Sequence, residues 1–412
     1  MTATAYFRDS KVLQRLHEGP LGAHIDVYAA RLITEGHSYQ SGARCLRVVG
    51  DYSLWLTRKR LDIDDVNENT VKQYQRFRVR YRHPFLSDNR ALTRLLAVLR
   101  EIQAIAPPTP TVLEPLEQIE ADFEHHLLQE RGLSRVSVIR HRPTLQRFLR
   151  EHCFDDGASL SKLTGADITH FVVRHAHDQS PRSAQSMCWT LRAFLRYLLY
   201  QGQIAVDLTT AVPSVRTWKF ATLPDHLSPD QVQQVLNRCD RGSKIGKRDF
   251  AVLLLLARLG LRANEVAMLV LDDVDWHTGR LTIRGKGRQR ASLPLLSEVG
   301  TALADYLKHG RPPTDSRQVF VRSLAPHTGF ASSSGISMIA TSALTRAGLA
   351  LRRKGAHIFR HSLATHMLRA GASLSEIGQV LRHSDHDTTR IYAKVDINAL
   401  SKLGLPWPGG VQ

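Results

Sequence analysis

Hydrophobic residues recur every three to four positions through most of the first 212 residues, which predicts helices rather than strands. In one run Val138, Leu145 and Leu149 share a helical face, and an earlier run places Val48 and Trp55 in the same way. Each run is followed by a further apolar stretch of helical length. We therefore expect two consecutive all-helical bundles.

The two helical segments also look like copies of each other. Residues 130–134 (Glu-Arg-Gly-Leu-Ser) echo residues 34–38 (Thr-Glu-Gly-His-Ser), and residues 163–168 parallel residues 66–71. The offset is roughly 96 to 98 residues throughout. A tandem duplication explains this pattern. The alternative is that two unrelated four-helix bundles share the same periodicity.

Two proline-rich stretches, residues 104–115 and 211–229, interrupt the helical pattern. Proline cannot continue a helix and stiffens a linker, so both stretches predict domain boundaries. The expected parts are an N-terminal helical domain at 1–106, a second helical domain at 115–212, a linker at 213–226 and a final domain at 227–412.

The pattern changes to a mixed one from Leu227 onward. Residues 281–284 alternate in hydrophobicity as a strand does, residues 290–294 form the expected return strand, and residues 319–321 form a further short strand. Helical spacing predicts helices at 232–235, 250–259, 337–347, 358–370 and 374–381. The whole chain is therefore expected to be multidomain, with all-α bundles followed by a mixed α+β domain.

Charge indicates the kind of partner. The chain carries 56 basic and 38 acidic residues, a net charge of +18. Such an excess favours a polyanion, with DNA or RNA as the first candidate, although some basic proteins bind neither.

The cysteines and the lengths of the apolar runs indicate the cellular compartment in which the protein works. The four cysteines are scattered without a Cys-x-x-Cys pair, so buried thiols are expected rather than disulfides or a zinc site. No run approaches the ~20 apolar residues of a membrane span, and residues 1–21 lack the layout of a signal peptide. We expect a cytoplasmic protein with no membrane partner.

Six residues with phosphate chemistry lie in the final domain. Two arginines, a lysine and two histidines could surround one phosphate, because arginine pairs with phosphate oxygens and stays charged. A tyrosine could attack that phosphate once cations or a base assist its phenol. The candidate catalytic residues are, in chain order, Arg262, Lys286, His357, Arg360, His383 and Tyr392.

Each candidate also has a more ordinary interpretation when taken alone. Arg262 could be a salt-bridge arginine held by Glu265, Lys286 a solvated lysine in a hairpin turn, and Tyr392 a core residue. His361 is expected to be structural or exposed to solvent. Several histidines lie nearby, but they lack a His-Glu-x-x-His pattern, so a metal site is not expected.

The order of these six residues resembles that of the tyrosine recombinase (phage integrase) family. The resemblance rests on Leu261-Arg262-Ala263-Asn264-Glu265, Gly285-Lys286-Gly287, His357-Ile358-Phe359-Arg360-His361, Leu381-Arg382-His383 and Arg390-Ile391-Tyr392. It covers 227–403 strongly and 116–212 moderately, and the latter resembles the SAM-like core-binding domain of the family. Arg382 departs from the family pattern, which commonly has glycine there.

The resemblance implies a site-specific recombinase, either an integrase or a transposase. By this resemblance Tyr392 would form a 3′-phosphotyrosine with DNA, Lys286 would protonate the leaving oxygen, and His357 would assist proton transfer. It also implies double-stranded DNA with specific recombination sites, a homotetramer on DNA that is weak or monomeric when free, and a Holliday junction. A transposon-encoded member would fit the extra N-terminal segment. The alternatives are a type IB topoisomerase and a non-catalytic DNA-binding regulator.

Further basic residues are candidates for contacts with the DNA backbone. They lie on the second helical bundle, in the linker, around the expected hairpin and just before the helix that contains Arg360. They are Arg140, Arg142, Arg147, Arg192, Lys219, Arg284, Arg288, Arg290, Arg352, Arg353 and Lys354.

Overall fold

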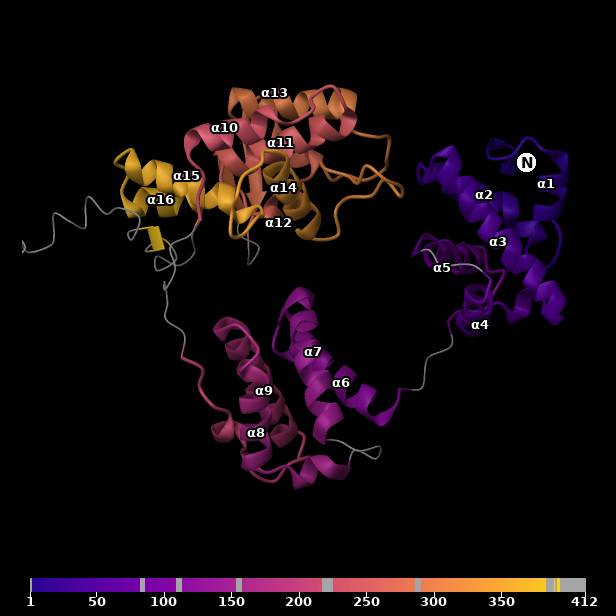
Figure 1. Ribbon diagram of the computed structural model, residues 1–412, viewed down its shortest axis with the longest axis horizontal. Coiled ribbons are helices and arrows are strands. Elements are labelled where there is room, and N and C mark those ends of the chain that lie inside the picture. The colour runs from indigo at the N-terminus through magenta and orange to yellow at the C-terminus, as the bar shows by residue number, and fades with distance from the viewer. Residues whose placement is uncertain are drawn as a thin grey trace, which may run out of the picture. The chain divides into compact units, whose positions relative to one another are not determined.

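A computed structural model describes most of the chain (Figure 1). The described residues are 2–81, 86–108, 113–152, 158–216, 225–285, 290–382, 389 and 391–392. The chain divides into two compact units, Met1–Pro108 together with Thr222–Gln412, and Thr109–Ala221. Within the first unit, the N-terminal and C-terminal segments each have a hydrophobic core of their own.

The N-terminal segment is entirely helical among its described residues, as its periodicity predicts. Ser38 begins α3 by accepting a hydrogen bond from the Ser41 NH, and Asn67 begins α4 in the same way by accepting from Asn69 and Thr70. The helices are α1 (Ser10–Leu16), α2 (Ile25–Thr34), α3 (Tyr39–Lys59), α4 (Glu68–Val79) and α5 (Leu86–Glu101).

The second unit is a four-helix bundle, with a core that includes Phe148, Phe171 and Phe194. Thr164 begins α8 by accepting from the Asp167 NH, while the Asp167 carboxylate accepts from Thr164 in return. The helices are α6 (Pro115–His125), which continues into a π-helical turn at His126–Glu130, α7 (Arg135–His152), α8 (Gly165–Ala176) and α9 (Pro181–Tyr200).

The two helical segments share an order of elements. In both, the long helix α3 or α7 starts after a serine cap, and the shorter helix α4 or α8 follows a 3₁₀ turn, at Ile63–Asp65 or Ala158–Lys162. A long apolar helix, α5 or α9, comes last. The two helical segments therefore have the same order of elements, as two copies of one module or two unrelated helical bundles of this kind would.

The C-terminal segment combines helices with one small antiparallel sheet, in the strand order β1-β2-β3. Arg284 pairs with Arg290 at the last described position of the β2–β3 hairpin. The elements are α10 (Pro229–Asn237), α11 (Lys244–Arg258), α12 (Ala263–Ala267), β1 (Val274–Asp275), β2 (Arg280–Arg284), β3 (Arg290–Pro294), α13 (Ser297–Asp305), which ends in a π-helical turn (Tyr306–Gly310), α14 (Ser334–Arg346), α15 (His357–Arg369) and α16 (Leu374–Leu381).

Helix α11 is the centre of this segment. Its residues 251–256 are buried, and it packs against α10, α12, α13, α14 and α15. Because the apolar residues cover nearly the whole circumference of the helix, α11 needs neighbours on every side. The helix ends at Arg258, four residues before Arg262, so the position of this helix also sets the position of that arginine.

The sequence predictions for this segment are partly confirmed. Ser228 begins α10 as expected, and β2, β3 and α16 lie where the pattern places them. The strand expected at 319–321 is wrong, because this apolar stretch makes only isolated bridges, Val270 to Gln318 and Val321 to Gly329. Its burial, rather than membership of the sheet, explains its hydrophobicity. No described helix is long and apolar enough to cross a membrane.

Candidate active site

Arg360 lies in the first turn of α15 and is 5% exposed. Its guanidinium donates to two backbone carbonyls from other elements, Nη1 to Gly260 O at 2.6 Å and Nη2 to Leu381 O. Gly260 follows α11 and Leu381 ends α16. Burial, followed by the charges of Arg262 and Arg382, lowers the pKa of Arg360 to about 10. The group therefore stays charged at neutral pH and joins three parts of the segment.

Arg262 is held by Glu265, three residues later. Glu265 Oε2 accepts from the Arg262 backbone NH at 2.8 Å, and Oε1 accepts from Arg262 Nη1 at 2.7 Å. A glutamate at the third helical position can reach back to the residue before the helix, so these bonds follow from local sequence. The sequence-based interpretation of Glu265 as the partner of Arg262 is confirmed.

A second arginine shares the same carboxylate. Arg382 Nη2 donates to Glu265 Oε2 at 3.1 Å, and the Arg382 carbonyl accepts from Arg262 Nη2 at 3.2 Å. Burial opposes ionisation of Glu265, but the Arg262 NH and the charges of Arg382 and Arg262 outweigh it and lower the pKa of the carboxyl. The substitution of arginine for the expected glycine therefore adds a contact to the site.

The backbone of Arg382 has a left-handed conformation, with φ of 55° and ψ of 50°. Glycine adopts this conformation without cost, whereas a residue with a Cβ is disfavoured by roughly 1 kcal/mol. Two donations from the Arg382 side chain, to Glu265 and to the Val380 carbonyl, offset this cost.

Tyr392 is buried, with 2% of its surface exposed. Its hydroxyl lies 2.9 Å from Nδ1 of His361, and the two ring centroids are 5.7 Å apart. Burial raises the pKa of Tyr392 to about 12 against the opposing charges of Arg360 and Arg262. Both arginines therefore lie close enough to the phenol to favour its anion.

His357 begins α15 one turn before His361, and their ring centroids are 6.5 Å apart. Partial desolvation, followed by the charges of Arg360 and Arg262, lowers the pKa of His357, although part of the residue faces solvent. His357 is therefore neutral at physiological pH and can accept a proton.

The structure thus brings four of the six candidates together: Arg262, His357, Arg360 and Tyr392. Lys286 and His383 lie outside the described residues. His361 was not among the candidates; it is half-buried, and its Nδ1 lies 2.9 Å from the tyrosine hydroxyl. Its i, i+4 spacing from His357 on one helical face was the available signal.

The candidate DNA-binding residues differ in whether their side chains have bonding partners within the protein. Arg142 pairs with Glu124 through two 2.6 Å bonds, Arg192 donates to the Val212 and Pro213 carbonyls, and Arg284 pairs with Asp273. These three have local structural partners. Lys219 and Arg288 lie outside the described residues. The remaining candidates are exposed, although Lys354 also donates to the Thr345 hydroxyl at 3.3 Å: Arg140, Arg147, Arg290, Arg352, Arg353 and Lys354.

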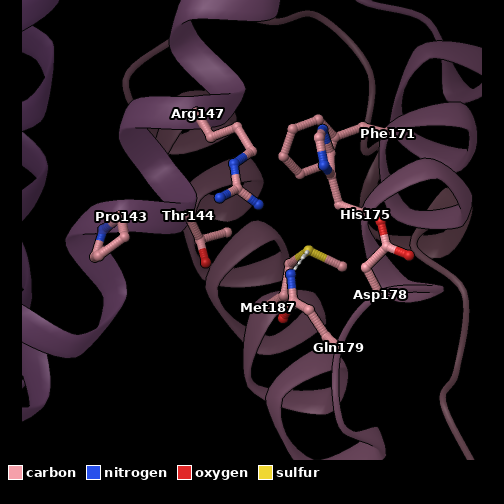
Figure 2. A pocket seen from close by; sticks show the side chains of 8 residues that line it. All are labelled: Pro143, Thr144, Arg147, Phe171, His175, Asp178, Gln179 and Met187. Atoms are coloured by element: carbon pink, nitrogen blue, oxygen red, sulfur yellow. Dashed lines mark hydrogen bonds between the residues drawn. The ribbon is translucent and has the colours of Figure 1, made fainter.

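The second unit contains a hollow of about 570 Å³ between α7, α8 and α9. Figure 2 shows the guanidinium of Arg147 extending toward its centre, with Phe171 and His175 on one side and Met187 and Gln179 below. The Gln179 amide lies 3.8 Å from the Met187 sulfur. Among the described residues, no group of three or more His, Cys, Asp or Glu side chains is arranged to hold a metal ion.

Comparisons with known proteins identify two matching families. The family described as "Phage integrase family" matches residues 225–398, and "Phage integrase, N-terminal SAM-like domain" matches residues 121–202. A Sinorhizobium fredii protein named as an integrase/recombinase, y4rA, is 42% identical over 97% of this chain and 98% of its own length. The N-terminal segment is thus largely shared with that relative.

Two further similarities concern shorter proteins. Tyrosine recombinase XerD of Listeria monocytogenes is 31% identical over 66% of this chain and 93% of its own length. Among solved structures, the site-specific recombinase XerH in a post-cleavage complex with its difH substrate has a TM-score of 0.57 at 19% identity, covering 70% of this chain and 84% of that chain. The latter similarity concerns the fold alone.

We predict that Glu265→Gln lowers the free energy of unfolding of the C-terminal segment by about 2–4 kcal/mol at neutral pH, because an amide cannot neutralise two guanidinium groups. The pKa of the folded carboxyl lies below that of unfolded glutamate, about 4.3. The carboxylate therefore stabilises the fold fully above about pH 4.3, and this stabilisation is lost as pH falls through the folded value.

The measurement is hydrogen exchange of peptides from α11 and α12 across a urea series at several pH values. The difference between wild type and Glu265→Gln should shrink below about pH 4. Glu298→Gln is the matched control, because Glu298 is the partially exposed partner of Arg258 at 3.0 Å and its loss should cost less than about 1 kcal/mol. Equal costs for both variants, or a difference that does not vary with pH, would contradict the assignment.

Proposed function

Because this chain belongs to the phage integrase family of tyrosine recombinases, we propose that it is a site-specific DNA recombinase that acts through a covalent 3′-phosphotyrosine. The observation that carries this proposal is the hydroxyl of Tyr392 beside the guanidinium groups of Arg262 and Arg360. A phosphate between them would have a nucleophile on one side and charge-assisted donors on the other.

In the proposed cleavage step, the Tyr392 oxygen attacks the phosphorus, and the bond from phosphorus to the 5′ oxygen breaks. Arg262 and Arg360 stabilise the charge that develops on the non-bridging oxygens. His383 is proposed to contribute a third donor. The phosphodiester energy is kept in the phosphotyrosine, so a 5′ hydroxyl can reverse the step without a metal or a nucleotide.

Two protons move in this step. The phenol loses one, which we assign to His357, because its lowered pKa leaves the imidazole neutral and able to accept it. The leaving 5′ oxygen gains one, which we assign to Lys286, between β2 and β3 in the sequence. Both arginines favour the phenolate that forms, since each opposes the raised pKa of Tyr392.

The wider reaction follows from the family. We propose that four copies assemble on two duplexes with specific recombination sites and exchange strands through a Holliday junction. Without DNA, the copies would associate weakly or be monomeric. The SAM-like bundle would also bind the DNA. The N-terminal segment would read further DNA or contact another copy, and a transposon-encoded member would fit this extension. The protein would work in the cytoplasm, on the DNA there.

We predict that Tyr392→Phe binds DNA with unchanged affinity but forms no covalent complex, because phenylalanine has no nucleophilic oxygen. A binding site is first selected from a randomised duplex pool, and a nicked version of it then traps the cleaved product. The covalent complex is measured as a protein–DNA band on a denaturing gel.

Tyr306→Phe is the matched control. Tyr306 is buried in the same segment, and its hydroxyl accepts a hydrogen bond from the Val321 backbone NH at 3.4 Å. This variant should form the complex at the wild-type rate. A covalent band that persists in Tyr392→Phe would contradict the proposal, and no band in any variant would favour a non-catalytic regulator.

We also predict steep salt dependence of DNA binding, because each neutralised phosphate releases counterions.

Replacing the exposed pair Arg352 and Arg353 with glutamine should reduce the slope of log K against log salt by about 2. A double variant with the same loss of charge, Arg317→Gln with Arg258→Gln, is the control, since both arginines pair with carboxylates. Equal slopes in both double variants would contradict a phosphate contact at 352–353.

A further inference from the structure

Nδ1 of His361 lies 2.9 Å from the hydroxyl of Tyr392, within hydrogen-bonding distance. His361 is half-buried, and its helix α15 also provides His357 and Arg360 to the site. The other histidine farther along this helix, His366, has a different task, because its Nε2 bonds the Leu227 carbonyl at 2.8 Å. The two histidines of this helix therefore have different partners: His361 contacts the candidate nucleophile, and His366 contacts the backbone before α10.

The surroundings of His361 keep its imidazole neutral. Burial, followed by His357 and Arg360 on the same helix, lowers its pKa to about 4. From the segment before α10, Asp225 opposes this lowering and His226 adds to it. The phenol beside it has its pKa raised to about 12 by burial, against the charges of Arg360 and Arg262. With values this far apart, the proton stays on the phenol.

We propose that His361 is a positioning residue that holds the hydroxyl of Tyr392 beside Arg262 and Arg360. Its neutral Nδ1 accepts the hydrogen bond of the protonated phenol and so fixes the rotation of the side chain before a phosphate arrives. It does not take the proton during attack, which remains the task assigned to His357. This inference rests on the proposed role of Tyr392 as nucleophile.

The test compares the first-order rate of covalent complex formation on the nicked duplex for wild type, His361→Leu and His361→Asn, from about pH 6 to pH 9. Leucine fills the space but accepts no hydrogen bond, so the rate should fall about 10-fold to 100-fold with unchanged DNA affinity. The amide oxygen of asparagine can lie where Nδ1 lies, so His361→Asn should recover to within about threefold of wild type.

The pH profile separates positioning from base catalysis. A positioning role predicts the same profile for wild type and His361→Asn, because neither acceptor titrates in the assayed range. A general base at His361 would instead remove one ionisation from the profile of the asparagine variant. His366→Gln controls for the loss of a histidine from α15 and should keep the wild-type rate and profile.

The outcomes distinguish this inference from the proposed function. A Tyr392-dependent complex that forms at the wild-type rate in His361→Leu overturns the inference alone, as does an asparagine variant as slow as the leucine variant or with an altered profile. A wild-type chain that forms no Tyr392-dependent complex overturns the proposed function and the inference with it.

Discussion

The buried guanidinium of Arg360 is the constraint on which the rest of the site depends. It donates to the carbonyl of Gly260, two residues before Arg262, and to that of Leu381, the residue before Arg382. One charged side chain thus connects three stretches of the chain, and the first and last of them are more than 100 residues apart in sequence. A side chain that lost these donations would leave two buried carbonyls without partners, each a cost of about 1–3 kcal/mol. The geometry around the phosphate site is therefore coupled to the fold itself.

The site holds an excess of positive charge with one shared carboxylate. Glu265 neutralises part of the charge on Arg262 and Arg382, while Arg360 donates to two neutral carbonyls. Burial lowers the pKa of Arg360 and of His357, and repulsion from the neighbouring arginines lowers it further. A phosphate would relieve this repulsion, so the same charges that strain the unliganded site favour binding of DNA and stabilise the charge that develops during attack.

The sequence was sufficient for the parts that depend on local pattern or on the family motif. It located the helical modules, the β2–β3 hairpin and the arginines, because periodicity, caps and the order of polar residues are local properties. It missed His361 and the second partner of Glu265, because both arise from contacts between residues 31 and 117 positions apart. It placed a strand at 319–321 because burial in an irregular segment gives the same apolar pattern as a strand.

The central claim is that Tyr392 is the one residue that becomes joined to DNA beside Arg262 and Arg360. The most direct measurement is mass spectrometry of the covalent complex trapped on a nicked duplex, after digestion of protein and DNA. The chain has ten tyrosines, so the modified peptide discriminates among them. The account predicts a nucleotide attached through phosphate to Tyr392 alone. A nucleotide on any other residue, with Tyr392 unmodified, would contradict it.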